Sequence, residues 1–244
     1  MQNNLNYPKE IYLLHNALSL GDSQIVRDYK ELEFLQSNKH LPLRFATKLK
    51  EIIANKIIPK IEKSFPNHGI ILNHNIIKHQ NNDNYIVINL IEEEQNMIRA
   101  LPFFTCNATI CKITNIENDI HTTAAIVINP VLNLFFWANQ SSNHAYEKNH
   151  RIKPSQTREL NKSYGIDFSN NNSINLNAIT LELCYLASGK LDFIIKKFTN
   201  YTDIVAAIHI ATISGIKFNI DFKNKIITAT ANDELLKKLP PPST

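Results

Sequence analysis

Apolar residues near the N-terminus recur at helical spacing. Ile11, Leu14 and Leu18 would share one face of a helix, with Asn6 and Pro8 placed to cap it and to start its first turn. Asp22 is placed to cap the next helix. The pattern therefore predicts that the chain opens with two helices, which cover residues 8–18 and 22–35.

A third, longer helix is predicted from apolar residues four positions apart: Leu49, Ile53, Ile57, Ile61 and Phe65. Pro59 lies inside this run, and since proline lacks a backbone N–H we expect it to kink or divide the helix. The turn sequence "PNHG" at 66–69 ends the helix, and "IIL" at 70–72 starts a short strand.

The middle of the chain changes to a strand pattern. Short apolar or alternating runs are separated by polar or proline-containing links, which is typical of a sheet. These runs lie at 85–91, 103–114, 122–129 and 132–139.

The last third alternates between helix and strand. Helices are expected near 178–188, 203–214 and 233–239, and strands near 191–195 and 225–230. The fold class indicated is α/β, with an α+β N-terminal subdomain over 1–165 and an α/β C-terminal subdomain over 166–244. We expect the two to form one compact unit of alternating helix and sheet layers.

Composition excludes several classes of protein. The 26 basic and 22 acidic residues give a net charge of +4 and form no polybasic arm, so there is no direct nucleic-acid signature. The most apolar stretch, 123–138, is too short and too interrupted to span a membrane. Cys106, Cys111 and Cys184 fit buried, reduced thiols. With no secretory signal at the N-terminus, a cytoplasmic location is expected.

The most unusual chemistry in the sequence is the run Glu92, Glu93 and Glu94 directly after an apolar strand. The run fits either a metal site at the end of a strand or acids that favour the positive end of a helix dipole. Asp203 has the same two interpretations. Three histidines between 68 and 79 lie in an Asn-rich turn with no metal-ligand spacing, which favours exposed loop side chains.

Several blocks in the same order resemble the inositol monophosphatase family over about residues 40–240. "IVINLIEEEQNMIRALPFF" (86–104) is similar to the family's strand, Asp-Pro-Ile-Asp-Gly-Thr-Thr-Asn loop and following Pro-Phe segment. "LELCYLASGKLDFIIKKFTNYTDIVAAIHIATISG" (181–215) resembles the family's helix, Gly-Arg-Leu-Asp strand, Trp-Asp pair and next helix. "ATANDELLKKL" (229–239) resembles its last helix. The resemblance implies the family's layered αβαβα sandwich.

In that family two or three Mg²⁺ ions are held by acidic side chains, and they polarise a phosphate ester and generate hydroxide. By this resemblance the metal ligands fall on Asn89, Glu92 and Asp203, with a further glutamate replaced by Asn73 or His74. The loop glycine falls on Glu93. The activating threonine falls on Glu94, which is then the candidate catalytic residue. Lys196 takes the place of an acid that contacts the inositol ring in some members, and is the candidate substrate-binding residue.

These replacements remove anionic ligands and put carboxylates where a phosphate would bind. We therefore expect an inactive member of the family that resembles the bacterial SuhB-type branch and acts as a cytoplasmic binding or regulatory protein, with no cofactor. That branch implies a homodimer and a protein partner in the transcription machinery. Two alternatives stay open: an Mg-dependent phosphatase of inositol or small sugar monophosphates that uses Glu92, Glu94 and Asp203, and a sensor of a small anionic ligand that uses Lys196.

Overall fold

The computed structural model describes residues 7–36, 41–80, 82–168 and 175–239. Its longer helices are α1 (Lys9–Leu18), α2 (Asp22–Leu35), α3 (Leu41–Ser64), α5 (Ile179–Ala187) and α6 (Tyr201–Ser214), and its short ones are α4 (Glu94–Ile98) and α7 (Asp233–Lys238). Single 3₁₀ turns lie at Ser19–Gly21, Gln140–Ser142 and Leu160–Lys162.

Two sheets account for the strands in these ranges. The larger has the order β2-β1-β3-β4-β5-β6-β7-β8 and the smaller β11-β12-β10-β9. The larger sheet comprises β1 (Gly69–Leu72), β2 (Asn75–Lys78), β3 (Asn84–Glu92), β4 (Thr105–Asn115), β5 (Asp119–Asn129), β6 (Leu134–Asn139), β7 (His144–Glu147) and β8 (His150–Arg151). The smaller comprises β9 (Gly165–Asp167), β10 (Phe193–Lys197), β11 (Lys217–Asp221) and β12 (Ile226–Thr230).

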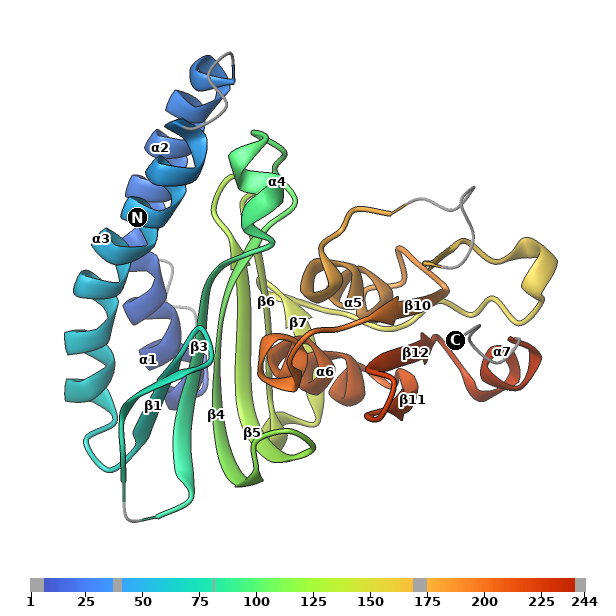
Figure 1. The fold of residues 1–244 in the computed structure, drawn as a ribbon. Coiled ribbons are helices and arrows are strands. Elements are labelled where there is room, and N and C mark those ends of the chain that lie inside the picture. The colour runs from blue at the N-terminus through green and yellow to red at the C-terminus, as the bar shows by residue number, and fades with distance from the viewer. Residues whose placement is uncertain (1–6, 37–40, 81, 169–174, 240–244) are drawn as a thin grey trace.

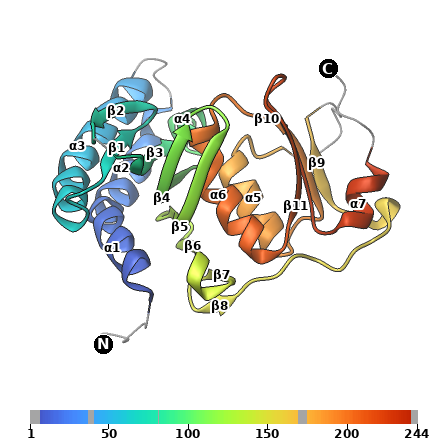
Figure 2. The ribbon, with the colours of Figure 1, turned by 90° about the horizontal axis from the view of Figure 1, so that it is seen from below.

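The elements stack in alternating layers. Helices α1, α2 and α3 cover one face of the large sheet, α5 and α6 lie between the two sheets, and α7 lies beside the small sheet (Figures 1 and 2). The predicted α/β class and the layered sandwich are therefore confirmed. The subdomain boundary between 165 and 166 stays a prediction, and strand β9 crosses it.

Both faces of the large sheet are buried, because its central strands carry apolar side chains on both sides. Ile86, Ile88 and Ile126 pack against the first three helices, while Ala125 and Val127 pack against α5 and α6. Such two-sided burial explains the nearly continuous apolar runs of β3 and β5. The three cysteines are buried and unpaired, as predicted.

In the N-terminal helices, two details of α3 differ from the sequence prediction. Helix α3 continues through Pro59 rather than dividing there, and it starts earlier than the apolar spacing suggested. The first helix does start beside Pro8, whereas Asn6 lies outside the described residues. None of the helices in the described ranges is both long enough and apolar enough to cross a membrane.

Candidate functional site

The end of strand β3 has an irregular backbone that places the acidic run. The pairing of β3 with β4 shifts register between Asn89 and Glu92, and both Ile91 and Glu93 have positive φ angles, of 53° and 65°. Positive φ is costly for a β-branched residue. Side chains hold this segment: Leu90 N donates to Asn73 Oδ1 at 2.8 Å. The bulge therefore ends the ladder and directs the acids toward a cleft.

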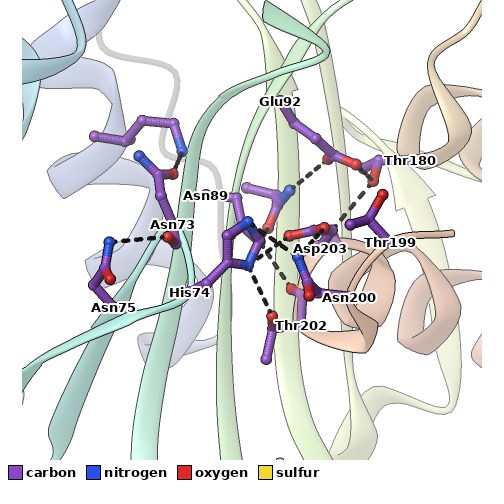
Figure 3. A network of polar contacts seen from close by, with 12 residues as sticks. Asn73, His74, Asn75, Asn89, Glu92, Thr180, Thr199, Asn200, Thr202 and Asp203 are labelled. Carbon is purple, nitrogen blue, oxygen red and sulfur yellow. Dashed lines mark hydrogen bonds and ion pairs between the residues drawn. The ribbon is translucent and has the colours of Figure 1, made fainter. Parts of the chain in front are cut away.

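Asn89 is buried, and its amide nitrogen is fully used. Nδ2 donates to Asn107 Oδ1 at 3.1 Å and to the carbonyl oxygen of Thr202 at 2.8 Å (Figure 3). These bonds join β3 to β4 and to the first turn of α6. The amide thus acts as a bridge between layers, and its Oδ1 has no hydrogen-bond partner in the described part of the chain.

Glu92 is surrounded by three hydrogen-bond donors from two elements. Thr180 Oγ1 on α5 donates to Oε1 at 2.7 Å, and Thr105 Oγ1 and Asn107 Nδ2 on β4 donate to Oε2 at 3.2 and 3.0 Å. Burial raises the pKa of Glu92 well above its usual value, although the hydrogen bonds from Thr180 and Thr105 oppose the rise. Both carboxylate oxygens are therefore already satisfied by the protein.

Asp203 contacts a histidine from another part of the chain. His74 Nδ1, in the turn between β1 and β2, lies 3.0 Å from Asp203 Oδ1 (Figure 3). Asn200 Nδ2 donates to Asp203 Oδ2 at 3.4 Å, and His74 also contacts Thr202 Oγ1 at 3.3 Å. Burial raises the pKa of Asp203, and the His74 imidazole opposes that rise. We call these residues the β3–α6 polar network: Asn73, His74, Asn89, Glu92, Asn107, Thr180, Thr202 and Asp203.

The other two glutamates have different surroundings. Glu94 lies in the first turn of α4 and pairs with Lys50 at 2.8 Å. Glu93 is the residue before α4, and its carboxylate accepts a hydrogen bond from the Ile179 amide at the start of α5. Burial raises the pKa of Glu93 to about 7, and Lys196 limits the rise. The run therefore does start a helix, and Asp203 lies in the first turn of α6, as the helix-dipole interpretation predicted.

Lys196 points into the protein. Its Nζ lies 3.2 Å from Glu182 Oε2, both side chains are at least nine-tenths buried, and Asn175 Oδ1 also accepts from it. The cleft beside the network has a volume of about 350 Å³, and Lys197 rather than Lys196 is among its lining residues. The role of Lys196 in binding a ligand stays a prediction.

The donor set of the cleft does not fit Mg²⁺. Asn89 offers a neutral amide oxygen and no charge, Asn73 Oδ1 is occupied by a backbone amide, and Asp203 Oδ1 lies 3.0 Å from His74 Nδ1. Mg²⁺ needs oxygen ligands in near-octahedral geometry and loses its waters reluctantly. In the described part of the chain no three His, Cys, Asp or Glu side chains gather as a metal centre.

The structure thus brings Asn89, Glu92 and Asp203 together, with Glu94 at the rim of the same cleft. Asn107 and Thr180, which bind Glu92, were not predicted from the sequence. Their positions 15 and 88 residues from Glu92 carry no local signal, although Asn107 is a polar residue on an otherwise apolar strand.

Comparison with solved structures identifies the fold. The extragenic suppressor protein SuhB of Bartonella henselae matches with a TM-score of 0.77 and 18% identity, over 95% of this chain and 97% of that one. Mycobacterium tuberculosis SuhB gives 0.72 and 14% over 96% and 95%. An inositol monophosphatase from Anabaena gives 0.68 and 17% over 94% and 98%. No family model and no curated protein matches the sequence. The chain has the inositol monophosphatase fold.

Proposed function

We propose that this protein is a member of the inositol monophosphatase family, of the SuhB type, that binds a partner and does not hydrolyse phosphate esters. The fold shared with SuhB and inositol monophosphatase structures supports the family. The observation that carries the loss of catalysis is the contact of His74 Nδ1 with Asp203 Oδ1, at 3.0 Å, beside a buried amide at position 89.

The argument rests on charge. Of the four positions that the resemblance gives to metal ligands, only Glu92 and Asp203 are acidic, and Asp203 already faces an imidazole. A divalent cation would have to displace His74 from Asp203, and at position 89 it would find one neutral amide oxygen in place of a carboxylate. Since anionic oxygen ligands supply most of the affinity for Mg²⁺, its binding should be very weak.

The phosphate position is also changed. Glu93 and Glu94 stand where the family has a glycine and a threonine, and Glu93 takes the hydrogen bond of the Ile179 amide. Two like charges 4 Å apart repel by about 1 kcal/mol in water and about 4 kcal/mol at an effective dielectric of 20. A phosphate dianion would meet part of this repulsion without a metal to offset it, since Lys50 pairs with Glu94 and Glu93, with a pKa of about 7, is partly ionised at neutral pH.

A non-catalytic role leaves binding as the function. In line with the SuhB resemblance, we propose a cytoplasmic homodimer whose partner is a component of the transcription machinery. The test is affinity purification of the full chain from native cytosol, with recovery of RNA polymerase subunits above that of an unrelated bait. Recovery equal to that bait would contradict this choice of partner, and leave the loss of catalysis unaffected.

The catalytic part of the proposal is tested by phosphate release from inositol 1-phosphate in millimolar Mg²⁺. The Anabaena inositol monophosphatase serves as the positive control. We expect the protein to release no more phosphate than buffer, with no change in Glu92→Gln or Asp203→Asn. Steady turnover that both substitutions abolish would overturn the proposal and favour a phosphatase with a rearranged site.

A further inference from the structure

A pocket of about 490 Å³ is lined by two hairpin turns and the start of helix α6, and we call it the hairpin pocket. The β4–β5 turn supplies residues 116–118, and the β11–β12 turn supplies Phe222, Lys223 and Lys225. Most of the remaining lining is the segment 198–202, which leads from β10 into α6. Sites for small ligands usually have volumes of about 300–1,000 Å³, so the pocket has the size for a compact ligand.

Three aromatic side chains meet in the hairpin pocket. The rings of Tyr201 and Phe222 lie 5.2 Å apart at 75°, and Phe198 lies 6.4 Å from each of them. Phe198 is almost fully buried, whereas Phe222 is 37% exposed and Ile116, on the β4–β5 turn, is 38% exposed. A ligand that covers such exposed apolar surface gains free energy by removing it from water. The pocket therefore offers partly exposed aromatic surface to a flat, apolar group.

The charged side chains of the hairpin pocket favour an anion. Lys223 makes no salt bridge with another described residue, because the carboxylate of Asp221 is bound within its own turn and does not line the pocket. Lys225 Nζ donates to the Thr199 carbonyl at 2.7 Å, which fixes a second positive charge. Glu117 is the one acid among the described lining residues. Two lysines against one acid leave the pocket with positive charge to pair with a ligand.

From this combination we propose that the hairpin pocket binds a nucleoside monophosphate, with the base against Phe222 and the phosphate beside Lys223. A base stacks on aromatic side chains through its flat π-face, and lysine pairs with phosphate as a point charge. Asn118 and Thr199 add neutral donors and acceptors to the lining. Inorganic phosphate alone would leave the aromatic surface exposed, and an uncharged sugar would leave the lysine without a counter-charge.

The hairpin pocket adjoins the cleft but does not include the metal-ligand positions. His74, Phe198 and Thr199 line both spaces, whereas Glu92 and Asp203 line the cleft and not the hairpin pocket. This ligand therefore goes beyond the proposed partner binding and needs no metal ion. Failure to bind a nucleotide would leave both the loss of catalysis and the choice of partner unaffected.

The test is calorimetric titration of the full chain with AMP, with adenosine, which lacks the phosphate, and with ribose 5-phosphate, which lacks the base. We expect saturable binding of one AMP per chain, and binding about tenfold weaker or more for each of the other two. Phe222→Ala and Lys223→Gln should each weaken AMP binding by about tenfold. Phe34→Ala on α2 and Lys60→Gln on α3 alter exposed residues of the same two types far along the chain, and should bind AMP as the unmodified chain does.

Phe222 and Lys223 are exposed turn residues, so both variants should fold, which a thermal melt checks. The absence of saturable AMP binding would overturn the proposal. AMP affinity unchanged in both variants would also overturn it, since the nucleotide would then bind elsewhere on the protein. Adenosine or ribose 5-phosphate binding as tightly as AMP would overturn the assignment to a nucleotide, because only one half of the ligand would be recognised.

Discussion

The amide nitrogen gives Asn89 its structural role, because both hydrogen-bond partners of this nitrogen are acceptors. Asn107 Oδ1 and the Thr202 carbonyl each receive a hydrogen from it, and only 3% of Asn89 is exposed. A carboxylate at this position would turn two hydrogen bonds into two repulsive contacts and bury a charge without a partner.

Asn89→Asp, which gives this position a metal-ligand carboxylate, should therefore destabilise the protein by about 3 kcal/mol or more. Urea unfolding with and without millimolar Mg²⁺ measures this. Asn84→Asp, at the exposed start of the same strand, is the control and should change the free energy of unfolding by less than about 0.5 kcal/mol. Full recovery of Asn89→Asp on addition of Mg²⁺ would show that the cleft can hold the ion.

Glu93 makes stability depend on pH, because its pKa is about 7 in the folded protein and near 4.5 when exposed. Between these values the folded chain holds a proton that the unfolded chain has lost, so the free energy of unfolding falls as pH rises from about 4.5 to 7. Below 4.5 and above 7 the contribution of Glu93 is constant.

Glu93→Gln should remove this dependence. Relative to the unmodified chain, it should be more stable at pH 7.5 than at pH 4.5, by a difference on the order of 1 kcal/mol, since the carboxylate is partly solvated. Denaturant unfolding at the two pH values measures the difference. The exposed Glu62→Gln on α3 is the control. Equal effects of Glu93→Gln at both pH values would mean that Glu93 ionises as freely in the folded protein as in the unfolded chain.

The sequence identified the charged residues of the site but not their partners. The run 92–94 was conspicuous because three acids follow an apolar strand, and the helix-start role of Glu94 follows from local rules. The link from Glu92 to Thr180 depends on how α5 packs against the large sheet, which no local pattern encodes. The contact of His74 with Asp203 likewise joins residues 129 positions apart.

Among the elements, the pairing of β9 with β10 depends on a close approach that only glycine permits. Gly165 lies opposite Phe193, and a Cβ at position 165 would come within 2.4 Å of the Phe193 ring. The phenylalanine therefore fills the space that a side chain at 165 would need.

Gly165→Ala should destabilise the protein by about 1–3 kcal/mol, because the small sheet has to shift or the ring has to move. Thermal or urea unfolding measures the loss. In Gly165→Ala combined with Phe193→Leu, the smaller side chain should relieve part of the clash, so the two effects should not add. Strict additivity in the double-mutant cycle would contradict the steric explanation.

The long elements were predictable and the short edge strands were not. Helices α1, α2, α5 and α6 and strands β3 to β6 carry enough apolar residues to show their period. Strand β2 was missed, because it depends on a two-residue turn in which Asn73 and His74 both have positive φ. Strand β11 was missed since its exposed and half-buried residues resemble a polar loop.

On the scale of the whole molecule, two apolar cores lie on opposite faces of one sheet. The first three helices close one core, and α5, α6 and the small sheet close the other. Because the large sheet belongs to both cores, the layers should unfold together rather than one by one. The order of the layers followed from the resemblance, whereas the sequence pattern alone gave only the alternation of helices and strands.

The whole molecule also has an oligomeric state that can be measured. The SuhB resemblance predicts a homodimer, and sedimentation equilibrium should then give twice the chain mass of 27.9 kDa. A mass of one chain at micromolar concentration would contradict the prediction and would remove the dimer from the proposed function.

The β3–α6 polar network should determine how well the protein tolerates replacements at these positions in the cell. Its side chains tie two strands and two helices to one another, so replacing them should lower the amount of protein in the cell before it alters any chemistry. In a saturation mutagenesis screen that measures abundance, these cleft positions should tolerate as few replacements as the apolar interior does. The metal ligands of working phosphatases should tolerate more replacements in such an abundance screen, because those residues are selected for turnover.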